Sequence, residues 1–228
     1  MGDISGRLLF MLLGLPGFIP GIVLHELAHA MAAYRLGDPT AKQMGRITLR
    51  PEAHFDPFGA LFYVFSALFS PVVFGWAKPV PINPFNFRHP RRDFALSSLA
   101  GPVSNLLQIG MWAVLLRLLR PELVAFRSVL IASAIAMRAG DWLGIILTEA
   151  ILINAVLCCF NLVPIPPLDG SRVLAYVLPE RQAQVLDRLE PIGLPILFLL
   201  MFLGLFHLLG PYMIWLGDLF LRALGAGL

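Results

Sequence analysis

A long stretch without charge, Leu8–Leu24, leads directly into His25, Glu26 and, after two more residues, His29. Apolar runs of about this length form helices that enter a lipid bilayer. Ionisable side chains at such a depth are costly, and by default they mark a functional site. The first constraint on the fold is therefore a membrane helix that carries ionisable groups where its apolar run ends.

The composition of the whole chain indicates an integral membrane protein. Of its 228 residues, 58% are hydrophobic and 14% are charged, whereas soluble domains carry about 25% charged residues. We expect an all-α polytopic membrane protein with about four to six transmembrane helices. It should form a single domain over residues 1–228, with a core at about 7–175 and C-terminal helices at about 191–226.

The net charge of +3 comes from basic residues beside apolar segments. Such clusters suit contact with the anionic headgroups of a lipid bilayer. The chain contains no nucleic-acid-binding motif, so we expect no nucleic-acid partner. The sequence sets no oligomeric state.

Four segments are predicted to be membrane-spanning helices, at about 7–36, 94–119, 142–163 and 191–209. The first contains Pro16 and Pro20 and is expected to kink or restart there. Two further segments are ambiguous: 121–138 suits an interfacial helix or a poor span, and 211–224 suits an amphipathic helix or a short return span.

The apolar segment Pro57–Trp76 has basic residues on both sides. Four precede it (Arg35, Lys42, Arg46 and Arg50) and four follow it (Lys78, Arg88, Arg91 and Arg92). The positive-inside rule places both flanks in the cytoplasm, and Ser70-Pro71 supplies a break in the helix. We therefore predict a re-entrant segment, with an ordinary span and a basic external loop as the alternative.

Before this segment, Arg46-Ile47-Thr48-Leu49-Arg50 alternates between polar and apolar residues as a strand does. We expect a small β strand or hairpin here, lying at the membrane surface. Such a strand could pair with an extended substrate.

His25 and His29 fall on one face of a helix, because residues four apart are neighbours there. That face can offer two imidazole nitrogens to a zinc ion, with Glu26 beside them as general base. Zinc also needs a third protein ligand and an open position for water.

Asp169 is the candidate third ligand. It follows a segment with three prolines, Pro164, Pro166 and Pro167, which cannot continue a helix. Irregular backbone is tolerated in a membrane only where it lines a polar cavity or is buried in protein. His29 lies six residues, about 9 Å of helix, before Arg35, and Asp169 lies three residues before Arg172, so the ligands are expected at similar depth near the cytoplasmic side.

Each of these residues has an ordinary structural alternative. His25 and His29 could be core histidines packed between helices, and Glu26 could be a partner for one of them. Asp169 could cap the helix that begins near Ser171. Their combination in apolar surroundings favours a shared metal site.

Two motifs together resemble the site-2 protease family of intramembrane zinc metalloproteases: the His25–His29 pentapeptide and Asn161-x-x-Pro-x-Pro-x-Leu-Asp169-Gly. Ala100-Gly101-Pro102-x-x-Asn105 resembles the motif on the intervening helix of that family. Three more motifs resemble its compact bacterial and archaeal branch: Gly37-Asp38-Pro39-Thr40, His54-x-Asp56-Pro57-x-Gly59 and Gly75-Trp76-Ala77-Lys78-Pro79-Val80-Pro81. The resemblance covers about the first 175 residues.

The resemblance implies that His25, His29 and Asp169 bind Zn2+ and that Glu26 activates the zinc-bound water. The expected activity is that of a zinc-dependent intramembrane endopeptidase. Its partner would be a membrane-protein substrate, cut in or near a transmembrane helix. The expected location is the plasma or inner membrane of the cell, as a multi-pass protein with its active site towards the cytoplasmic side.

A transmembrane substrate must be unwound before cleavage, and Asn161 and Asn105 are candidates for pairing with its freed backbone. Asn105 could instead brace the helices through an interhelical hydrogen bond. Two alternative functions remain: a catalytically silent scaffold that binds membrane helices, and a metal transporter that uses the same ligands in transit. The intact Glu26 argues against the scaffold, and the convergence of ligands at one depth argues against the transporter.

Overall fold

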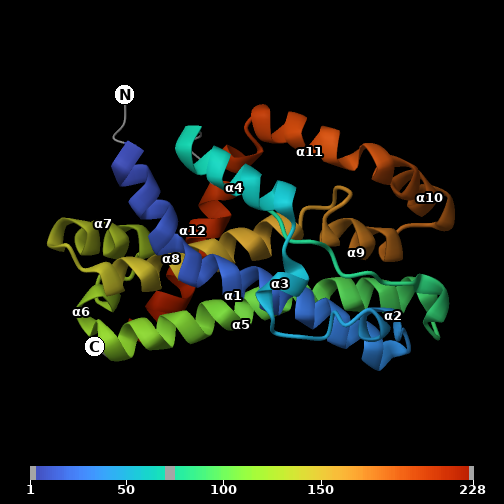
Figure 1. The fold of residues 1–228 in the computed structure, drawn as a ribbon, viewed down its shortest axis with the longest axis horizontal. Coiled ribbons are helices and arrows are strands. Elements are labelled where there is room, and N and C mark those ends of the chain that lie inside the picture. The colour runs from blue at the N-terminus through green and yellow to red at the C-terminus, as the bar shows by residue number, and fades with distance from the viewer. Residues whose placement is uncertain (1–3, 70–74, 226–228) are drawn as a thin grey trace.

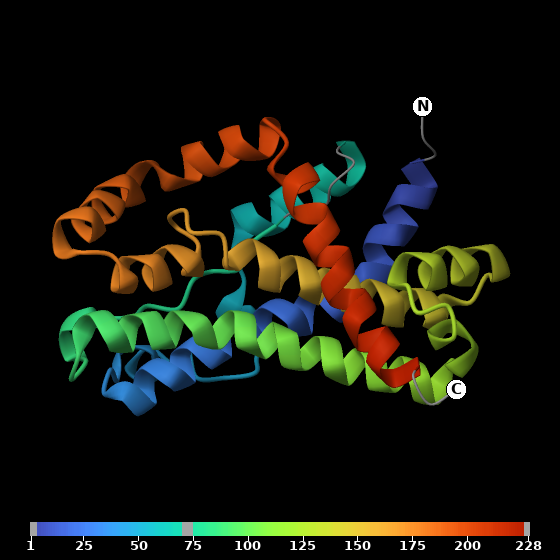
Figure 2. The same cartoon turned by 180° about the vertical axis from the view of Figure 1, so that it is seen from behind.

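Helices α1 (Ile4–Leu36), α5 (Pro90–Leu119) and α8 (Trp142–Asn161) form the centre of the protein, and each packs against the other two. The computed structural model describes residues 4–69 and 75–225, and Figures 1 and 2 show these helices from opposite sides. Asn105 of α5 joins all three, because its amide nitrogen donates to the Gly21 carbonyl of α1 and to the side-chain oxygen of Asn154 on α8. Such hydrogen bonds hold helices together in apolar surroundings.

These three helices are also long and apolar enough to cross a membrane. A fourth candidate span is a bent pair, Glu180–Phe202 and Leu205–Gly225, whose halves meet at 81°. The described residues thus contain three or four candidate spans, whereas four to six were expected, so only the count of four falls within that range. Every regular element in the described ranges is a helix, which confirms the all-α class.

The first helix continues without interruption through Pro16 and Pro20, so the predicted restart is absent. The predicted single span at 191–209 is also wrong. There the chain forms α10 (Glu180–Leu189), η2 (Glu190–Ile192), α11 (Gly193–Phe202) and, after a sharp turn, α12 (Leu205–Gly225). Gly204 makes the turn with φ +100°, a backbone conformation that glycine adopts without steric cost.

The predicted β strand or hairpin at Arg46–Arg50 is likewise absent from the described residues. This segment is irregular and lies between α2 (Thr40–Gln43) and α3 (Pro51–His54). The extended chain that lies against it contains Pro79 and Pro81, which have no N–H to donate to a strand ladder. The side chain of Arg46 points inward to the carbonyls of that chain instead.

After α4 (Pro57–Phe69) the chain returns to the place where that helix began. The Lys78 N–H donates to the carbonyl of His54 over 2.9 Å, and Trp76 packs against Phe62 of α4 with ring centroids 5.5 Å apart. The 13 residues of α4 extend about 20 Å, less than the roughly 30 Å of a bilayer core. The return of the chain fits a re-entrant segment, whose position in a membrane stays a prediction; the expected break at Ser70-Pro71 lies outside the described residues.

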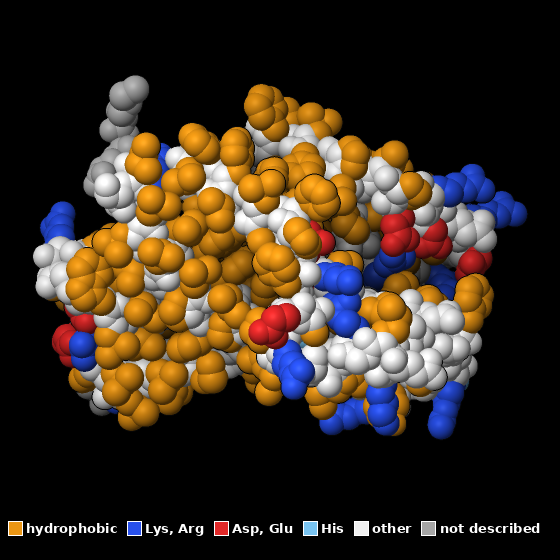
Figure 3. Space-filling model, in the orientation of Figure 1, with side chains coloured by type: hydrophobic (Ala, Val, Ile, Leu, Met, Phe, Trp, Pro, Cys, Tyr) orange, Lys and Arg blue, Asp and Glu red, His pale blue; other side chains and the backbone are white. Residues whose placement is uncertain are grey.

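The segment 121–138 forms two short helices, α6 (Pro121–Val124) and α7 (Val129–Ala139), which are too short to span. The remaining short elements are η1 (Pro84–Asn86) and α9 (Asp169–Val177). The main buried cluster lies among α5, α7, α8 and α12 and includes Ile109, Val129, Ile151 and Leu221. Figure 3 shows a broad apolar surface over the half that carries α7, whereas Lys and Arg side chains gather at the end that carries α2 and α10.

Cysteine accessibility tests the return of the chain between Arg50 and Lys78. In a background with Cys158 and Cys159 replaced, we expect single cysteines at Arg50 and Lys78 to react with a membrane-impermeant thiol reagent from the same side of sealed vesicles. A cysteine at the exposed Arg138 of α7, a helix that lies at the end of the protein away from α2 (Figure 1), should react only from the other side. Labelling of positions 50 and 78 from opposite sides would show that the segment spans.

Candidate metal centre

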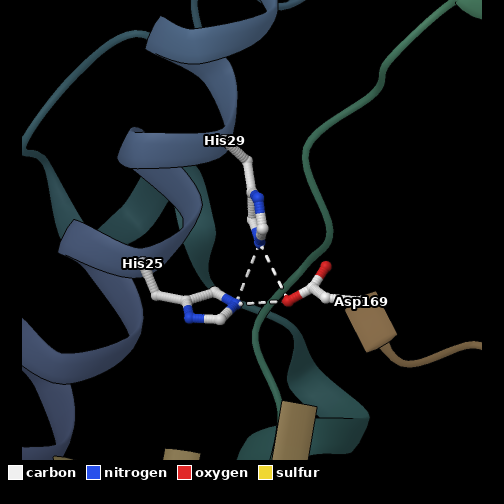
Figure 4. A group of neighbouring side chains, drawn as sticks. All are labelled: His25, His29 and Asp169. Carbon is white, nitrogen blue, oxygen red and sulfur yellow. Dashed lines mark hydrogen bonds and ion pairs between the residues drawn. The ribbon is translucent and has the colours of Figure 1, made fainter. Parts of the chain in front are cut away.

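Three side chains from two distant parts of the chain converge at one point between α1 and the start of α9 (Figure 4). The Nε2 atoms of His25 and His29 are 3.0 Å apart, and each is 3.2 Å from Oδ2 of Asp169. Both imidazoles are buried, at 6% exposure. The convergence expected from the sequence is therefore present in the structure.

The other ring nitrogen of each histidine is hydrogen-bonded to an acceptor. Nδ1 of His29 donates to the backbone carbonyl of Ser97 over 2.8 Å, and Nδ1 of His25 donates to the side-chain oxygen of Asn105 over 2.6 Å. The Asn105 oxygen faces His25 because its amide nitrogen donates to Gly21 and Asn154. With the proton on Nδ1, each Nε2 presents a lone pair to the common point, as in metal-binding histidines.

These atoms fit a zinc ion. Oδ2 of Asp169 is buried and accepts no hydrogen bond within the described ranges, so it is available as a ligand. Bonds of about 2.0–2.1 Å in a tetrahedron separate ligand atoms by roughly 3.3 Å, close to the 3.0–3.2 Å observed. Three protein ligands leave the fourth position of a tetrahedral site for water or substrate.

Space for the ion depends on Gly101 in α5. A Cβ at this position would lie 2.3 Å from Nε2 of His29 and 2.6 Å from Cε1 of His25. Any side chain here would therefore push against the metal-binding face of the imidazoles. The glycine lets α5 lie against both rings.

Asp169 reaches the site because α8 ends at Asn161 and α9 begins at Asp169, with the proline segment between them. This confirms the expected end of the helix before the prolines. Leu168, not Asp169, is the N-cap residue of α9, and it makes no side-chain capping bond. The alternative in which Asp169 serves as the helix cap is therefore not what the structure shows.

Glu26 lies on the same helix between the two histidines and is half-buried. Its Oε2 accepts a hydrogen bond of 2.8 Å from the backbone N–H of Val80. Val80 belongs to the extended stretch 75–83, which runs past the metal site. The carboxylate is thus held by the segment that returns from α4.

The two asparagines occupy different environments. Asn105 is fully buried, and both its oxygen and its nitrogen are bonded within the chain, which corresponds to the bracing alternative rather than to substrate contact. Asn161 is half-buried at the end of α8, and its nitrogen donates to the carbonyl of Leu157. Contact of Asn161 with substrate stays a prediction.

The sequence did not predict Ser97, Val80 or Asn154 as parts of this site. Ser97 and Val80 act through backbone atoms, so their side chains carry no signal. Asn154 could have been found, because it is an amide in an apolar helix and lies two turns before Asn161 on the same face.

Comparison with known proteins agrees with this site. Residues 14–204 match the model of peptidase family M50. The chain is 39% identical over 199 residues to "Putative zinc metalloprotease YwhC" of Bacillus subtilis, covering 86% of this chain and 81% of that protein. It is 31% identical over 169 residues to "Putative zinc metalloprotease Rip2" of Mycobacterium tuberculosis, covering 73% of this chain and 58% of that protein.

No solved structure matches the chain at a significant level. The family match covers most of the chain and includes all three residues of the candidate metal centre. The names of both relatives contain the words "putative zinc metalloprotease". This chain belongs to peptidase family M50, the site-2 protease family, and is a zinc metalloendopeptidase.

Proposed function

We propose that this protein is an intramembrane endopeptidase that hydrolyses peptide bonds in or near transmembrane segments of membrane proteins. The observation that carries the proposal is the position of the candidate metal centre. His25 and His29 lie on α1 and are braced by α5, and both helices are long and apolar enough to cross a membrane. A hydrolytic site between such helices would meet peptide bonds that soluble proteases do not reach.

The side of the membrane is also proposed. His25 and His29 lie in the C-terminal half of α1, which leads into α2. Lys and Arg side chains gather at the end of the molecule that carries α2 and α10 (Figure 3). Basic residues flanking membrane helices favour the cytoplasmic side. This supports an active site that faces the cytoplasm in the plasma or inner membrane.

His25, His29 and Asp169 would hold the metal ion. When bound, zinc supplies the Lewis acidity that makes water nucleophilic near neutral pH and polarises the scissile carbonyl. Glu26 would take a proton from the attacking water and deliver it to the leaving amine, as a general base and then a general acid. The Val80 N–H holds one oxygen of Glu26 and leaves the other oxygen available for proton transfer.

An unwound substrate exposes backbone groups that need partners. Asn161 lies at the end of α8, where the proline segment towards Asp169 begins, and is partly exposed. We propose that its side chain contacts the freed backbone of the substrate. Asn105, which orients His25, is left out of this role.

Glu26→Gln tests the general base. Gln keeps an oxygen that can accept from Val80 but cannot take a proton. We expect zinc content to stay unchanged, and cleavage of a model transmembrane substrate in liposomes to fall by about 10²- to 10⁴-fold. The control is Glu52→Gln, an exposed glutamate on α3, which should cleave normally. Retained cleavage by Glu26→Gln would remove the residue from its role, and zinc flux without proteolysis would favour a transporter.

Asp169→Asn tests metal binding without reference to activity. Loss of the carboxylate should weaken zinc affinity by at least the roughly 10- to 100-fold that loss of an outer hydrogen-bond partner costs. Competition with a chromophoric chelator measures the affinity. The matched variant Asp187→Asn alters a solvent-exposed aspartate and should bind zinc normally. Wild-type affinity in Asp169→Asn would exclude this residue as a ligand.

A further inference from the structure

Arg46 is buried at 6% exposure, although it lies in a polar segment outside the membrane-spanning helices. It forms no ion pair within 4.0 Å in the described part of the chain. Its guanidinium instead donates to two successive backbone carbonyls, those of Lys78 over 2.5 Å and of Pro79 over 3.2 Å. Burial of a guanidinium on backbone carbonyls calls for an explanation, because desolvation of a charge is costly.

The peptide bond between Pro79 and Val80 connects Arg46 to Glu26. Arg46 donates to the carbonyl of this peptide, and Glu26 accepts from the N–H of the same peptide. The bond is trans and planar, so its C=O and N–H point in opposite directions. A cation and an anion therefore hold one rigid group from its two ends, an arrangement that polarises the peptide and strengthens both hydrogen bonds.

The surrounding sequence leaves Glu26 no second backbone donor on this stretch. Pro79 and Pro81 have no N–H, and the N–H of Lys78 is used by the carbonyl of His54. The Val80 N–H is therefore the one backbone donor that the segment Lys78–Pro81 offers to Glu26. The position of the Val80 N–H therefore sets the direction in which the Glu26 carboxylate points.

Electrostatics links the two side chains as well. Burial lowers the pKa of the Arg46 guanidinium from its ordinary value, and the nearby negative charge of Glu26 opposes that change. Nε of Arg46 is buried without an acceptor in the described structure. The guanidinium thus makes its two carbonyl contacts and lies near the charge of Glu26, although its own hydrogen-bonding capacity is left incomplete at Nε.

We propose that Arg46 is a positioning residue for Glu26. It fixes the carbonyls of Lys78 and Pro79, and through the Pro79–Val80 peptide it holds the Val80 N–H against the carboxylate. Arg46 touches neither the metal ligands nor the reacting atoms in this arrangement. The inference rests on the proposed role of Glu26 as general base.

Kinetics of Arg46→Met provide the first test, because methionine keeps an apolar stem but has no donor and no charge. We expect kcat on the model transmembrane substrate to fall roughly 10- to 100-fold, with KM and zinc content close to wild type. Arg46→Lys should restore part of kcat, since an ammonium keeps the charge but cannot match the guanidinium fork. The exposed Arg50→Met is the matched control and should leave kcat unchanged.

Hydrogen exchange at Val80 provides the second test and needs no turnover. Within Lys78–Pro81 only Lys78 and Val80 carry a backbone amide hydrogen, because proline has none. We expect faster exchange at Val80 in Arg46→Met than in wild type, and no change in Arg50→Met. If Arg46→Met does not fold, Arg46→Lys carries both measurements, with an intermediate loss of kcat and of amide protection.

Wild-type kcat in Arg46→Met, or unchanged exchange at Val80, would overturn the inference. So would a loss expressed in KM or in zinc content alone, because that pattern belongs to substrate binding or to general loss of structure. Failure of the proposed function is recognised separately, from retained cleavage by Glu26→Gln. The exchange measurement on Arg46 variants does not depend on that outcome.

Discussion

Two imidazole nitrogens and a carboxylate oxygen face one another across 3.0–3.2 Å, and all three present lone pairs to the same point. Lone pairs this close repel one another in apolar surroundings, and a cation between them would offset that repulsion. Several other elements of the structure bring these three groups together. α1 carries two of the candidate ligands, the break after α8 positions the third, and Gly101 lets α5 approach without filling the space that an ion would need.

A second layer of hydrogen bonds sets the direction of these ligands. Asn105 connects α1, α5 and α8 while it orients His25, so the packing of the three central helices and the geometry of the metal centre depend on one buried amide. The extended chain after α4 performs the corresponding task for Glu26 through the Val80 N–H. Helix packing and catalytic geometry are therefore coupled through a small number of side-chain and backbone contacts.

The sequence predicted the parts of this protein that repeat a simple physical pattern. Apolar runs located the three central helices, and the four-residue spacing of His25 and His29 located the shared face from which both imidazoles point. The proline segment indicated where Asp169 leaves the helix. The failures concern tertiary context. Alternation at Arg46–Arg50 predicted a strand, but the prolines of the neighbouring chain lack the N–H groups that a strand partner must donate. The apolar residues around Gly204 suggested one continuous span, whereas the chain turns sharply there. The carbonyl of Ser97 carries no side-chain signal at all.

The convergence of α1 and α9 has a consequence for the whole chain. Its two cysteines, Cys158 and Cys159, are both free, so no disulfide ties remote segments together. An ion shared by His25, His29 and Asp169 would link such segments, because it would join the first helix to the start of the ninth. Metal that binds only the folded state adds its binding free energy to the stability of the fold. A chelator that removes this ion would therefore lower the stability of the tertiary structure as well as the hydrolytic activity.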